Sequence, residues 1–180
     1  MREAKIHMGY LINPAINAPK NQGSITMINI VLVEPQIPQN TGNIGRLCVA
    51  GNARLHLIYP LGFSTDEKAL KRAGMDYWQR LEVHEYENLA HFWESHPMDA
   101  RHFLLSTKAE QVYYDARFCE ECYLYFGRED RGLDAGLLTA HASQVYKIPM
   151  HSDTRSINLA TSVGAVLYEA IRQSGSYLRF

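Results

Sequence analysis

Hydrophobic residues after residue 26 fall into short apolar runs separated by longer amphipathic stretches. Runs of strand length predict six strands, at Ile28–Val33, Leu55–Tyr59, Leu81–His84, His102–Ser106, Tyr123–Phe126 and Val145–Ile148. Helical spacing predicts five helices, at Asn43 to about Ala53, Asp66–Gly74, Glu87–Ser95, Asp134–His141 and Ile157 to about Ser174. This alternation of strands and helices predicts an α/β fold, with a mostly parallel sheet flanked by helices.

The two ends of this pattern differ. The last predicted helix is the longest, with Ser156 as its expected cap and Gly175 as its expected stop. Residues 1–26 have no sustained hydrophobic period and are rich in Asn, Pro, Gly, Gln and Ser from Asn13 to Ser24. We therefore predict a mobile extension over residues 1–26 and a single domain over residues 27–180, with packing of the extension against a partner subunit as the alternative.

Composition and charge narrow the class of protein. The chain has 180 residues, of which 46% are hydrophobic and 21% charged, the balance of a globular domain. The net charge is -1, so any RNA binding would need a local basic patch. No apolar run is long enough to span a bilayer and no secretory signal is evident, so a cytoplasmic location without membrane contact is expected.

The cysteines and histidines do not predict a metal site. The three cysteines give no disulfide framework. Cys119 and Cys122 form a lone C-x-x-C, whereas a structural zinc site needs four ligands, so both are predicted to be structural thiols. The eight histidines are scattered and are expected on the surface or in satisfied core positions.

Asn40–Arg46 is the first segment that could carry chemistry. It connects the first predicted strand to the first predicted helix. Gly42 would allow a turn after which the backbone amides form a helix N-terminus able to meet an anion. Arg46 would then lie about one turn into the helix, where its guanidinium could grip a phosphate. The alternative is an ordinary turn with a surface arginine.

Phe126–Leu133 is the second such segment. Gly127 follows a buried strand, and a glycine there lets a ligand approach the backbone at the edge where α/β sheets bind ligands. The charged residues after it could also form nothing more than a solvated loop.

Ile148–Ala170 is the third segment. Small residues at Ala160, Ser162, Gly164 and Ala165 suit a helix that packs closely against a neighbour. Taken alone, Ser156 and Asn158 are explained as residues of a helix start, and Tyr168 as the edge of the core.

The order and spacing of these segments are more specific than any one of them. N-T-G-N-I-G-R, F-G-R-E-D-R-G-L and I-P-M followed by R-S-I-N-L-A-T-S-V-G-A-V-L-Y-E-A resemble the three motifs of the SPOUT methyltransferase superfamily. M-I-N-I-V-L-V-E-P-Q-I-P-Q-N-T-G-N-I-G-R-L-C and D-E-K-A-L-K-R-A-G-M-D-Y are similar to the family of small tRNA (cytidine/uridine-34) 2'-O-methyltransferases. The resemblance covers Met27 to Gln173. It implies a C-terminal trefoil knot, S-adenosylmethionine as cofactor, and a homodimer with sites at the subunit interface.

The resemblance also assigns residues. The expected cofactor-binding residues are Leu105, Ser106, Gly127, Glu129, Ile148 and Ser156. The positions associated with catalysis or with shaping the site are Arg46, Ser156, Asn158 and Tyr168, and those expected to meet RNA are Asn40 and Arg46. Arg128 and Asp130 stand where relatives vary, so the resemblance assigns them no role.

The expected activity is methyl transfer from S-adenosylmethionine to the ribose 2'-hydroxyl of the wobble nucleotide, position 34, of tRNA. Lys68, Lys71 and Arg72 lie one turn apart on a predicted helix and form a candidate basic patch for tRNA, or else a solvated helix face. Two alternatives stay open: a SPOUT enzyme acting on another RNA such as rRNA, and a non-catalytic RNA-binding module with the same fold. The choice of tRNA, the preference for cytidine or uridine and the general base are left undetermined.

Overall fold

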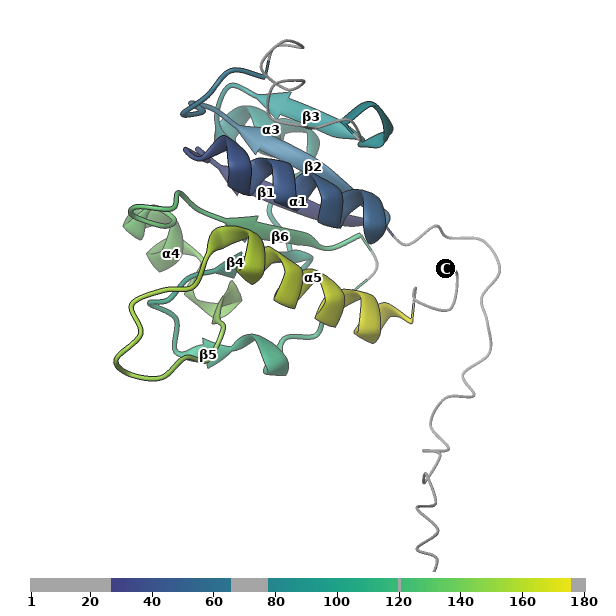
Figure 1. Ribbon diagram of the computed structural model, residues 1–180. Helices are drawn as coiled ribbons and strands as arrows, with labels where there is room; N and C mark the ends of the chain where they lie inside the picture. Colours follow the sequence, from purple (N-terminus) through teal and green to yellow (C-terminus); the bar gives the residue numbers. More distant parts are fainter. Residues whose placement is uncertain (1–26, 66–77, 120, 176–180) are drawn as a thin grey trace, which may run out of the picture.

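The computed structural model describes residues 27–65, 78–119 and 121–175, in which strands and helices alternate (Figure 1). The strands are β1 (Ile28–Val33), β2 (Ala53–Ile58), β3 (Val83–Tyr86), β4 (His102–Leu105), β5 (Gln111–Val112), β6 (Tyr123–Phe126) and β7 (Val145–Lys147). The α-helices are α1 (Pro38–Ala50), α3 (Leu89–Ser95), α4 (Ala135–Ala140) and α5 (Leu159–Ser174). The helix predicted at Asp66–Gly74 lies outside the described residues.

The strands form one sheet in the order β3-β2-β1-β6-β4-β7-β5. Every pair of neighbouring strands is parallel. In the centre, Tyr123 at the start of β6 is level with Asn29 of β1 on one side and with His102 of β4 on the other. The predicted α/β fold with a parallel sheet is confirmed. The C-terminal knot stays a prediction, because strand order alone does not define it.

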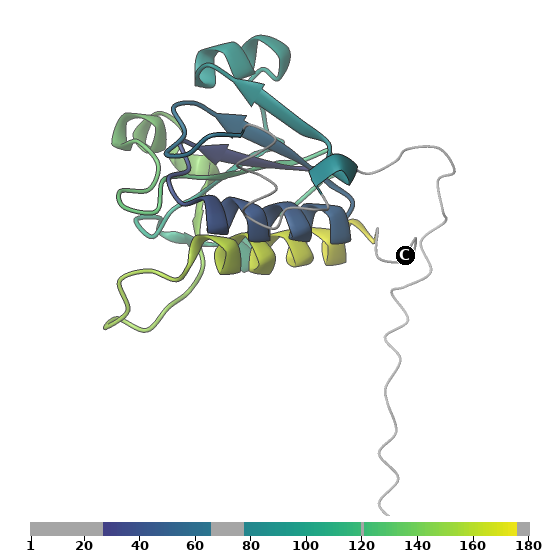
Figure 2. The same ribbon diagram turned by 45° about the horizontal axis from the view of Figure 1, so that its top comes forward.

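Helices α1 and α5 lie side by side on one face of the sheet (Figure 2). Ile28, Ile30 and Leu32 of β1 share the large apolar cluster with the buried residues of both helices. Val31, between them in the sequence, belongs to a second cluster that includes Phe92 of α3. The side chains of β1 therefore alternate between two covered faces, as expected for a strand inside a parallel sheet.

The start of α1 corrects the first motif prediction. The helix begins at Pro38, five residues before the predicted Asn43. Thr41 and Gly42 are therefore buried helical residues, and the predicted anion-binding N-terminus after Gly42 is wrong. Proline is well suited to the first helical position, because its fixed φ is helical and its missing N–H is not needed there.

The start of α5 also differs from the prediction, whereas its end does not. Asn158, and not Ser156, is the N-cap: its Oδ1 accepts hydrogen bonds from the amides of Ala160 at 2.9 Å and Thr161 at 3.3 Å. Gly175 ends the helix with a φ of 66°, in the left-handed region that favours glycine. Strand β5 was not predicted from the sequence, since a two-residue strand leaves no periodic signal.

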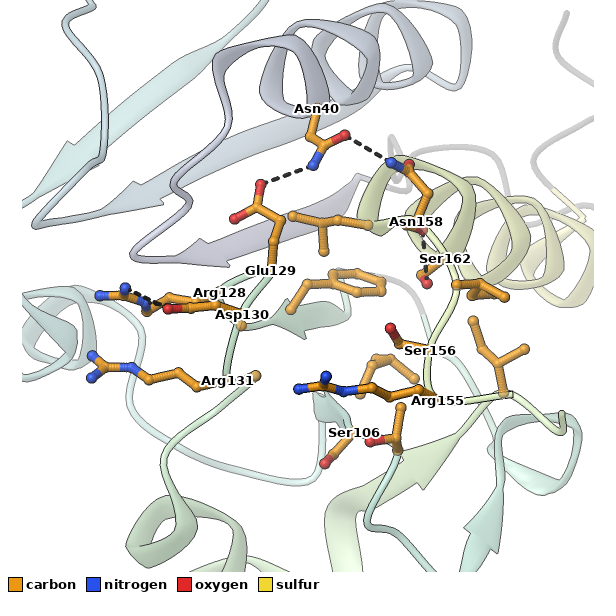
Figure 3. Close-up of a pocket in the computed structure, with 18 of the residues that line it drawn as sticks. Asn40, Ser106, Arg128, Glu129, Asp130, Arg131, Arg155, Ser156, Asn158 and Ser162 are labelled. Carbon is orange, nitrogen blue, oxygen red and sulfur yellow. Dashed lines mark hydrogen bonds and ion pairs between the residues drawn. The ribbon is translucent and has the colours of Figure 1, made fainter. Parts of the chain in front are cut away.

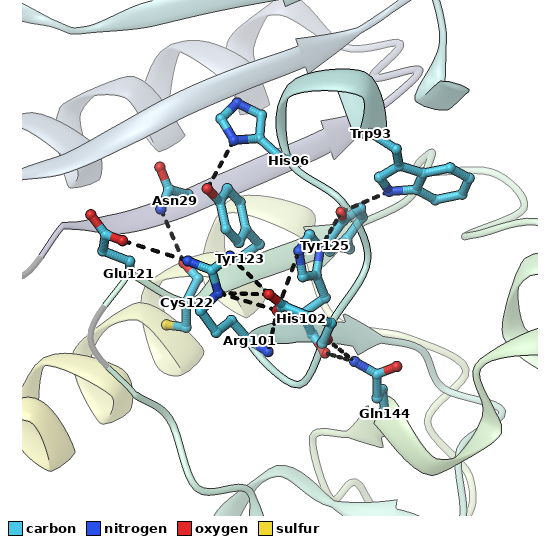
Figure 4. Close-up of polar contacts among 11 residues, drawn as sticks. Asn29, Trp93, His96, Arg101, His102, Glu121, Cys122, Tyr123, Tyr125 and Gln144 are labelled. Carbon is cyan, nitrogen blue, oxygen red and sulfur yellow. Dashed lines mark hydrogen bonds and ion pairs between the residues drawn. The ribbon is translucent and has the colours of Figure 1, made fainter. Parts of the chain in front are cut away.

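A polar network takes the place of aliphatic packing on the α3 side of the sheet. Tyr123, His96, Tyr86, His56 and Asn29 follow one another through hydrogen bonds of 2.9 to 3.2 Å. Their rings also contact one another and Phe92. Figure 4 shows part of this network near the amino-terminal ends of β1, β4 and β6. The prediction that core histidines are satisfied holds for His56, which is 1% exposed.

The side-chain amide of Asn29 determines which group donates in each hydrogen bond of this polar network. Its Nδ2 donates to the carbonyls of Met27 and Cys122, so its Oδ1 accepts from Nε2 of His56. A neutral His56 then accepts at Nδ1 from the Tyr86 hydroxyl. In the two remaining hydrogen bonds, Nε2 of His96 donates to the Tyr86 hydroxyl and the Tyr123 hydroxyl donates to Nδ1 of His96. This pattern requires both histidines of the network, His56 and His96, to be neutral.

Burial is the main cause that lowers the pKa of His56 to about 3, and the nearby groups of His84, His96 and Arg54 contribute to the same shift. The unfolded chain has the ordinary value of 6.5, so between these two values it binds more protons than the native state. The stabilisation is therefore complete above pH 6.5 and declines as the pH falls. We expect the free energy of unfolding, measured with urea, to fall by about 2 kcal/mol from His56 alone between about pH 7.5 and about pH 5.

His56→Gln should lower stability at both pH values and shrink the difference between them. The control is His151→Gln, at a side chain that is 78% exposed, and it should leave the full pH dependence. An unchanged pH dependence in His56→Gln would contradict the neutral-histidine network.

Candidate functional site

The loops that follow β1, β4, β6 and β7 meet at the carboxyl edge of the sheet and surround a cavity of about 760 Å³ (Figure 3). Parallel α/β sheets bind ligands at this edge, where successive loops converge. The cavity is lined by Ile37, Asn40, Leu105, Ser106, Thr107, Lys108, Phe126, Gly127, Arg128, Glu129, Asp130, Arg131, Gly132, Ile148, Met150, Arg155, Ser156, Ile157, Asn158, Leu159 and Ser162.

The loop after β6 closes into a tight turn. The amide of Gly132 donates to the carbonyl of Arg128 at 2.9 Å, and the two residues form an antiparallel bridge. A Cβ on Gly127 would lie 2.1 Å from the backbone carbon of Gly132, and Gly132 itself has a φ of 74°. Gly127 is therefore required by the close approach of backbone to backbone, whether or not a ligand is bound.

The carboxylate of Glu129, at the tip of this turn, holds the start of α1. It accepts hydrogen bonds from the amide of Gln36 at 2.9 Å and the amide of Ile37 at 3.2 Å. It also accepts one from Nδ2 of Asn40 at 3.0 Å. Ile37 occupies the N-cap position but has no capping side chain, and the two amides that Glu129 accepts from lie just before the first helical residue, where a negative charge is favourable.

Asn40 also forms a hydrogen bond with the N-cap residue of α5. Its Oδ1 accepts a hydrogen bond of 2.9 Å from Nδ2 of Asn158, whose own Oδ1 caps α5. The three sequence segments are thus joined by one hydrogen-bonded chain from Glu129 through Asn40 to Asn158 (Figure 3). Asn40 is 7% exposed and uses both ends of its amide within the protein. This geometry favours a positioning role over the direct RNA contact expected from the sequence.

Ion pairs brace the other side of the same loop. Arg128 binds Asp130 with two hydrogen bonds of 2.9 Å and lies 3.5 Å from the carboxylate of Glu34. Arg131 contacts the same Glu34 oxygen at 2.8 Å. The hydrogen bond from Arg128 lowers the pKa of Asp130 below its ordinary value. Glu34 has a φ of 52°, a strained backbone conformation that is tolerated at the end of β1.

All six residues expected to bind the cofactor line this one cavity, although they follow or end three different strands, β4, β6 and β7. Asn40 and Asn158 line it too. Arg46 and Tyr168 do not: Arg46 is exposed on the ninth position of α1, far from its start, and Tyr168 is 50% exposed on α5. The basic residues expected to bind RNA, Lys68, Lys71 and Arg72, lie outside the described residues.

Sequence reasoning missed several lining residues, among them Lys108, Met150 and Arg155. Lys108 and Met150 lie in the loops after β4 and β7, so the rule that strand ends carry the site would have found both. Arg155 directly precedes Ser156 in the third motif, and its charge was a signal that went unused.

Metal-binding clusters and membrane-spanning helices were not expected from the sequence. Over the described residues, no group of three or more His, Cys, Asp or Glu side chains is arranged to hold a metal ion. A helix both long and apolar enough to cross a membrane is not found in that part of the chain. Among the described residues, Cys119 and Cys122 form no disulfide, and burial raises the pKa of Cys122 to about 12, consistent with a structural role.

The parallel sheet, the cavity at its carboxyl edge and the three linked motifs define the chain as an α/β protein with the SPOUT methyltransferase fold. The chain belongs to the SpoU rRNA Methylase family, whose sequence model matches residues 27–168.

Individual relatives match over nearly their full length. The tRNA (cytidine(34)-2'-O)-methyltransferase of Yersinia pestis is 46% identical over 154 residues, covering 83% of this chain and 95% of the relative. The enzyme of the same name from Escherichia coli (strain K12) is 46% identical over 150 residues, with the same coverage. A solved structure described as giving insights into the 2-OH methylation of C/U34 on tRNA has a TM-score of 0.76 at 45% identity, covering 82% of this chain and 96% of that one.

The link through Asn158 can be tested by two substitutions. Asn158→Ala removes both the cap of α5 and the bond to Asn40, and we expect the free energy of unfolding to fall by about 1–2 kcal/mol. Asn158→Asp keeps a capping oxygen but loses the donor, so it should recover part of this loss. Urea denaturation followed by circular dichroism measures both.

Asn43→Ala, on the exposed face of α1, is the matched control and should change stability by less than about 0.5 kcal/mol. Wild-type stability in Asn158→Ala would show that the link between the motifs contributes nothing to the fold.

Proposed function

We propose that this chain transfers a methyl group from S-adenosylmethionine to the ribose 2'-hydroxyl of nucleotide 34 of a tRNA. The observation that carries the proposal is the 46% identity over 95% of the length of a tRNA (cytidine(34)-2'-O)-methyltransferase. It is supported by the cavity, because the six residues expected at the cofactor lie together there. We also infer that residues 27–180 act as one domain, since the family match begins at residue 27 and extends to residue 168.

The cavity suits the proposed cofactor in size and in chemistry. Its volume of about 760 Å³ falls within the range of small-molecule sites. Leu105, Ile148 and Met150 supply apolar surface for an adenine ring, while Ser106 and Ser156 supply hydroxyl groups for polar parts. When bound, S-adenosylmethionine supplies a methyl group that its sulfonium already makes electrophilic. The protein then has to position the 2'-hydroxyl and provide a route for its proton.

In this proposal, some of the described residues position the loops around the cavity and another binds negative charge. Glu129 and Asn158 hold the loops around the cavity in place through the hydrogen bonds to Asn40. Arg46 offers a fork of N–H donors that suits a phosphate or a developing oxyanion, and we assign it mainly as such a clamp. The identity of the group that accepts the hydroxyl proton is left open in this assignment.

A homodimer would reconcile the position of Arg46 with this role. Arg46 and Tyr168 are exposed on α1 and α5, which lie side by side, and neither residue lines the cavity. Gly164 and Ala165 are only half-buried in the described chain, so α5 has surface that can admit a close neighbour. The family resemblance implies a homodimer with sites at the subunit interface, and we infer that Arg46 and Tyr168 of one copy reach the cavity of a second copy.

The activity itself is tested with purified protein, S-adenosylmethionine and a tRNA transcript, followed by nucleoside analysis. We expect one 2'-O-methyl group at nucleotide 34. A matched transcript with a 2'-deoxynucleotide at that position lacks the acceptor and should receive no methyl group. Methylation elsewhere in the tRNA, or only in ribosomal RNA, would overturn the assignment.

Sharing of the site between two copies is tested by mixing two inactive variants. Arg46→Ala removes the clamp, and Ser156→Phe fills the cavity. In random dimers about half the molecules are mixed, and each of these has one site with both features intact, so about a quarter of wild-type activity should return. No recovery on mixing, with both variants folded and dimeric, would place Arg46 in the cavity of its own copy.

A further inference from the structure

The charges around the cavity do not balance. Four cations line it, Lys108, Arg128, Arg131 and Arg155, but only two carboxylates do, Glu129 and Asp130. All of them lie on loops at the carboxyl edge of the sheet. The excess is local, because the chain as a whole has a net charge of -1.

Internal contacts account for two of the cations. Arg128 is paired with Asp130 and Glu34, and Arg131 is paired with Glu34. Glu129 is taken up by the start of α1 and neutralises neither of the remaining two cations.

Lys108 and Arg155 are left without an ion pair among the described residues, and both are exposed. They come from two different loops that line the cavity, one after β4 and the other before α5. In Figure 3 the side chain of Arg155 extends across the cavity from the segment that carries Ser156 toward the loop of Asp130 and Arg131. A cation held over a cavity without a counter-charge favours the binding of an anion there.

The proposed cofactor would not supply enough negative charge. S-adenosylmethionine carries one carboxylate, one ammonium and one sulfonium, so its binding adds net positive charge to an already positive site. The substrate is then the natural source of negative charge. Phosphates of an RNA backbone meet this need, and arginine binds phosphate with two parallel hydrogen bonds.

We propose that Lys108 and Arg155 form a phosphate-binding edge of the cavity that grips the RNA backbone beside the nucleotide being methylated. This rests on the proposed function and deepens it, since it names residues that bring the RNA to the cofactor. The surface differs from the patch expected from the sequence, which lies in residues 66–77, outside the described part of the chain. It also explains how a chain without overall positive charge holds a polyanion at one place.

The test measures binding of an anticodon stem-loop RNA by fluorescence anisotropy across a series of salt concentrations, without cofactor. We expect Lys108→Gln with Arg155→Gln to weaken binding about tenfold or more at low salt. The slope of log affinity against log salt should become shallower by about 1.4, or about 0.7 for each phosphate of single-stranded RNA that the variant no longer neutralises. Each single variant should show roughly half of this change in slope.

Arg101→Gln is the matched control. Arg101 precedes β4, at the opposite edge of the sheet from the cavity, and is paired with Asp99 and Glu121. Its replacement should leave RNA affinity and salt dependence unchanged. If it weakens binding as much as the double variant, the contribution is general charge and the proposed edge is refuted.

Calorimetry with S-adenosylmethionine separates the RNA from the cofactor as the anion that is bound. The double variant should bind the cofactor within about twofold of wild type, a difference of about 0.4 kcal/mol. Loss of cofactor binding with unchanged RNA affinity would show that the cations serve the cofactor's carboxylate and would overturn the proposal. Wild-type binding of both ligands would overturn it as well.

The experiments distinguish failure of the phosphate-binding edge from failure of the proposed methylation of nucleotide 34. If the double variant loses RNA affinity but wild type does not methylate nucleotide 34, the phosphate-binding edge stands and the substrate assignment falls. If wild type methylates nucleotide 34 and the double variant does so with unchanged KM for tRNA, the edge falls and the function stands.

Discussion

The carboxylate of Glu129 is the group on which the arrangement of the site depends. It accepts hydrogen bonds from the amides of Gln36 and Ile37 and from Nδ2 of Asn40, so it anchors the start of α1, whose N-cap residue has no capping side chain. Hydrogen bonds to a charged acceptor are about twice as strong as neutral ones, and a negative charge at a helix N-terminus is further favoured by the helix dipole. The start of α1 and the loop after β6 therefore stabilise each other, because the amides before the helix and the carboxylate of Glu129 are hydrogen-bond partners.

Hydrogen bonds connect this carboxylate to the loop on the other side of the cavity. Asn40 lies between Glu129 and Asn158, and Asn158 caps α5, so residues 118 positions apart in the chain are joined by one side-chain hydrogen bond. The parallel register of β1, β6 and β4 brings the loops close enough for these short side chains to meet. Arg128 pairs with Asp130 and Glu34, and Arg131 pairs with Glu34. Of the described cations that line the cavity, Lys108 and Arg155 are left without an ion pair.

The sequence predicted the elements that depend on local signals and missed those that depend on distant ones. The buried strands and the glycine end of α5 were found, because their signals are apolar runs and a left-handed stop. Pro38 was a local signal for the start of α1 that went unused, whereas the position of Glu129 beside Gln36 follows only from the sheet topology. The same holds for Asn158, which was expected as one residue of a helix start but also anchors Asn40. The six cofactor positions came from resemblance, and no periodicity would have gathered them.

The buried histidines also lie away from the cavity. The histidines of the polar network lie under α3, and burial lowers the pKa of His56 and of His102, the latter to about 4. None of the described residues that line the cavity is a histidine, the usual general base near neutral pH. In the proposed reaction, the substrate's own phosphate or a group brought by a second copy can accept the proton of the 2'-hydroxyl. The proposed clamp role fits the exposed position of Arg46, because a guanidinium that approaches the cavity of a second copy from outside can hold the phosphate and the hydroxyl of the RNA together.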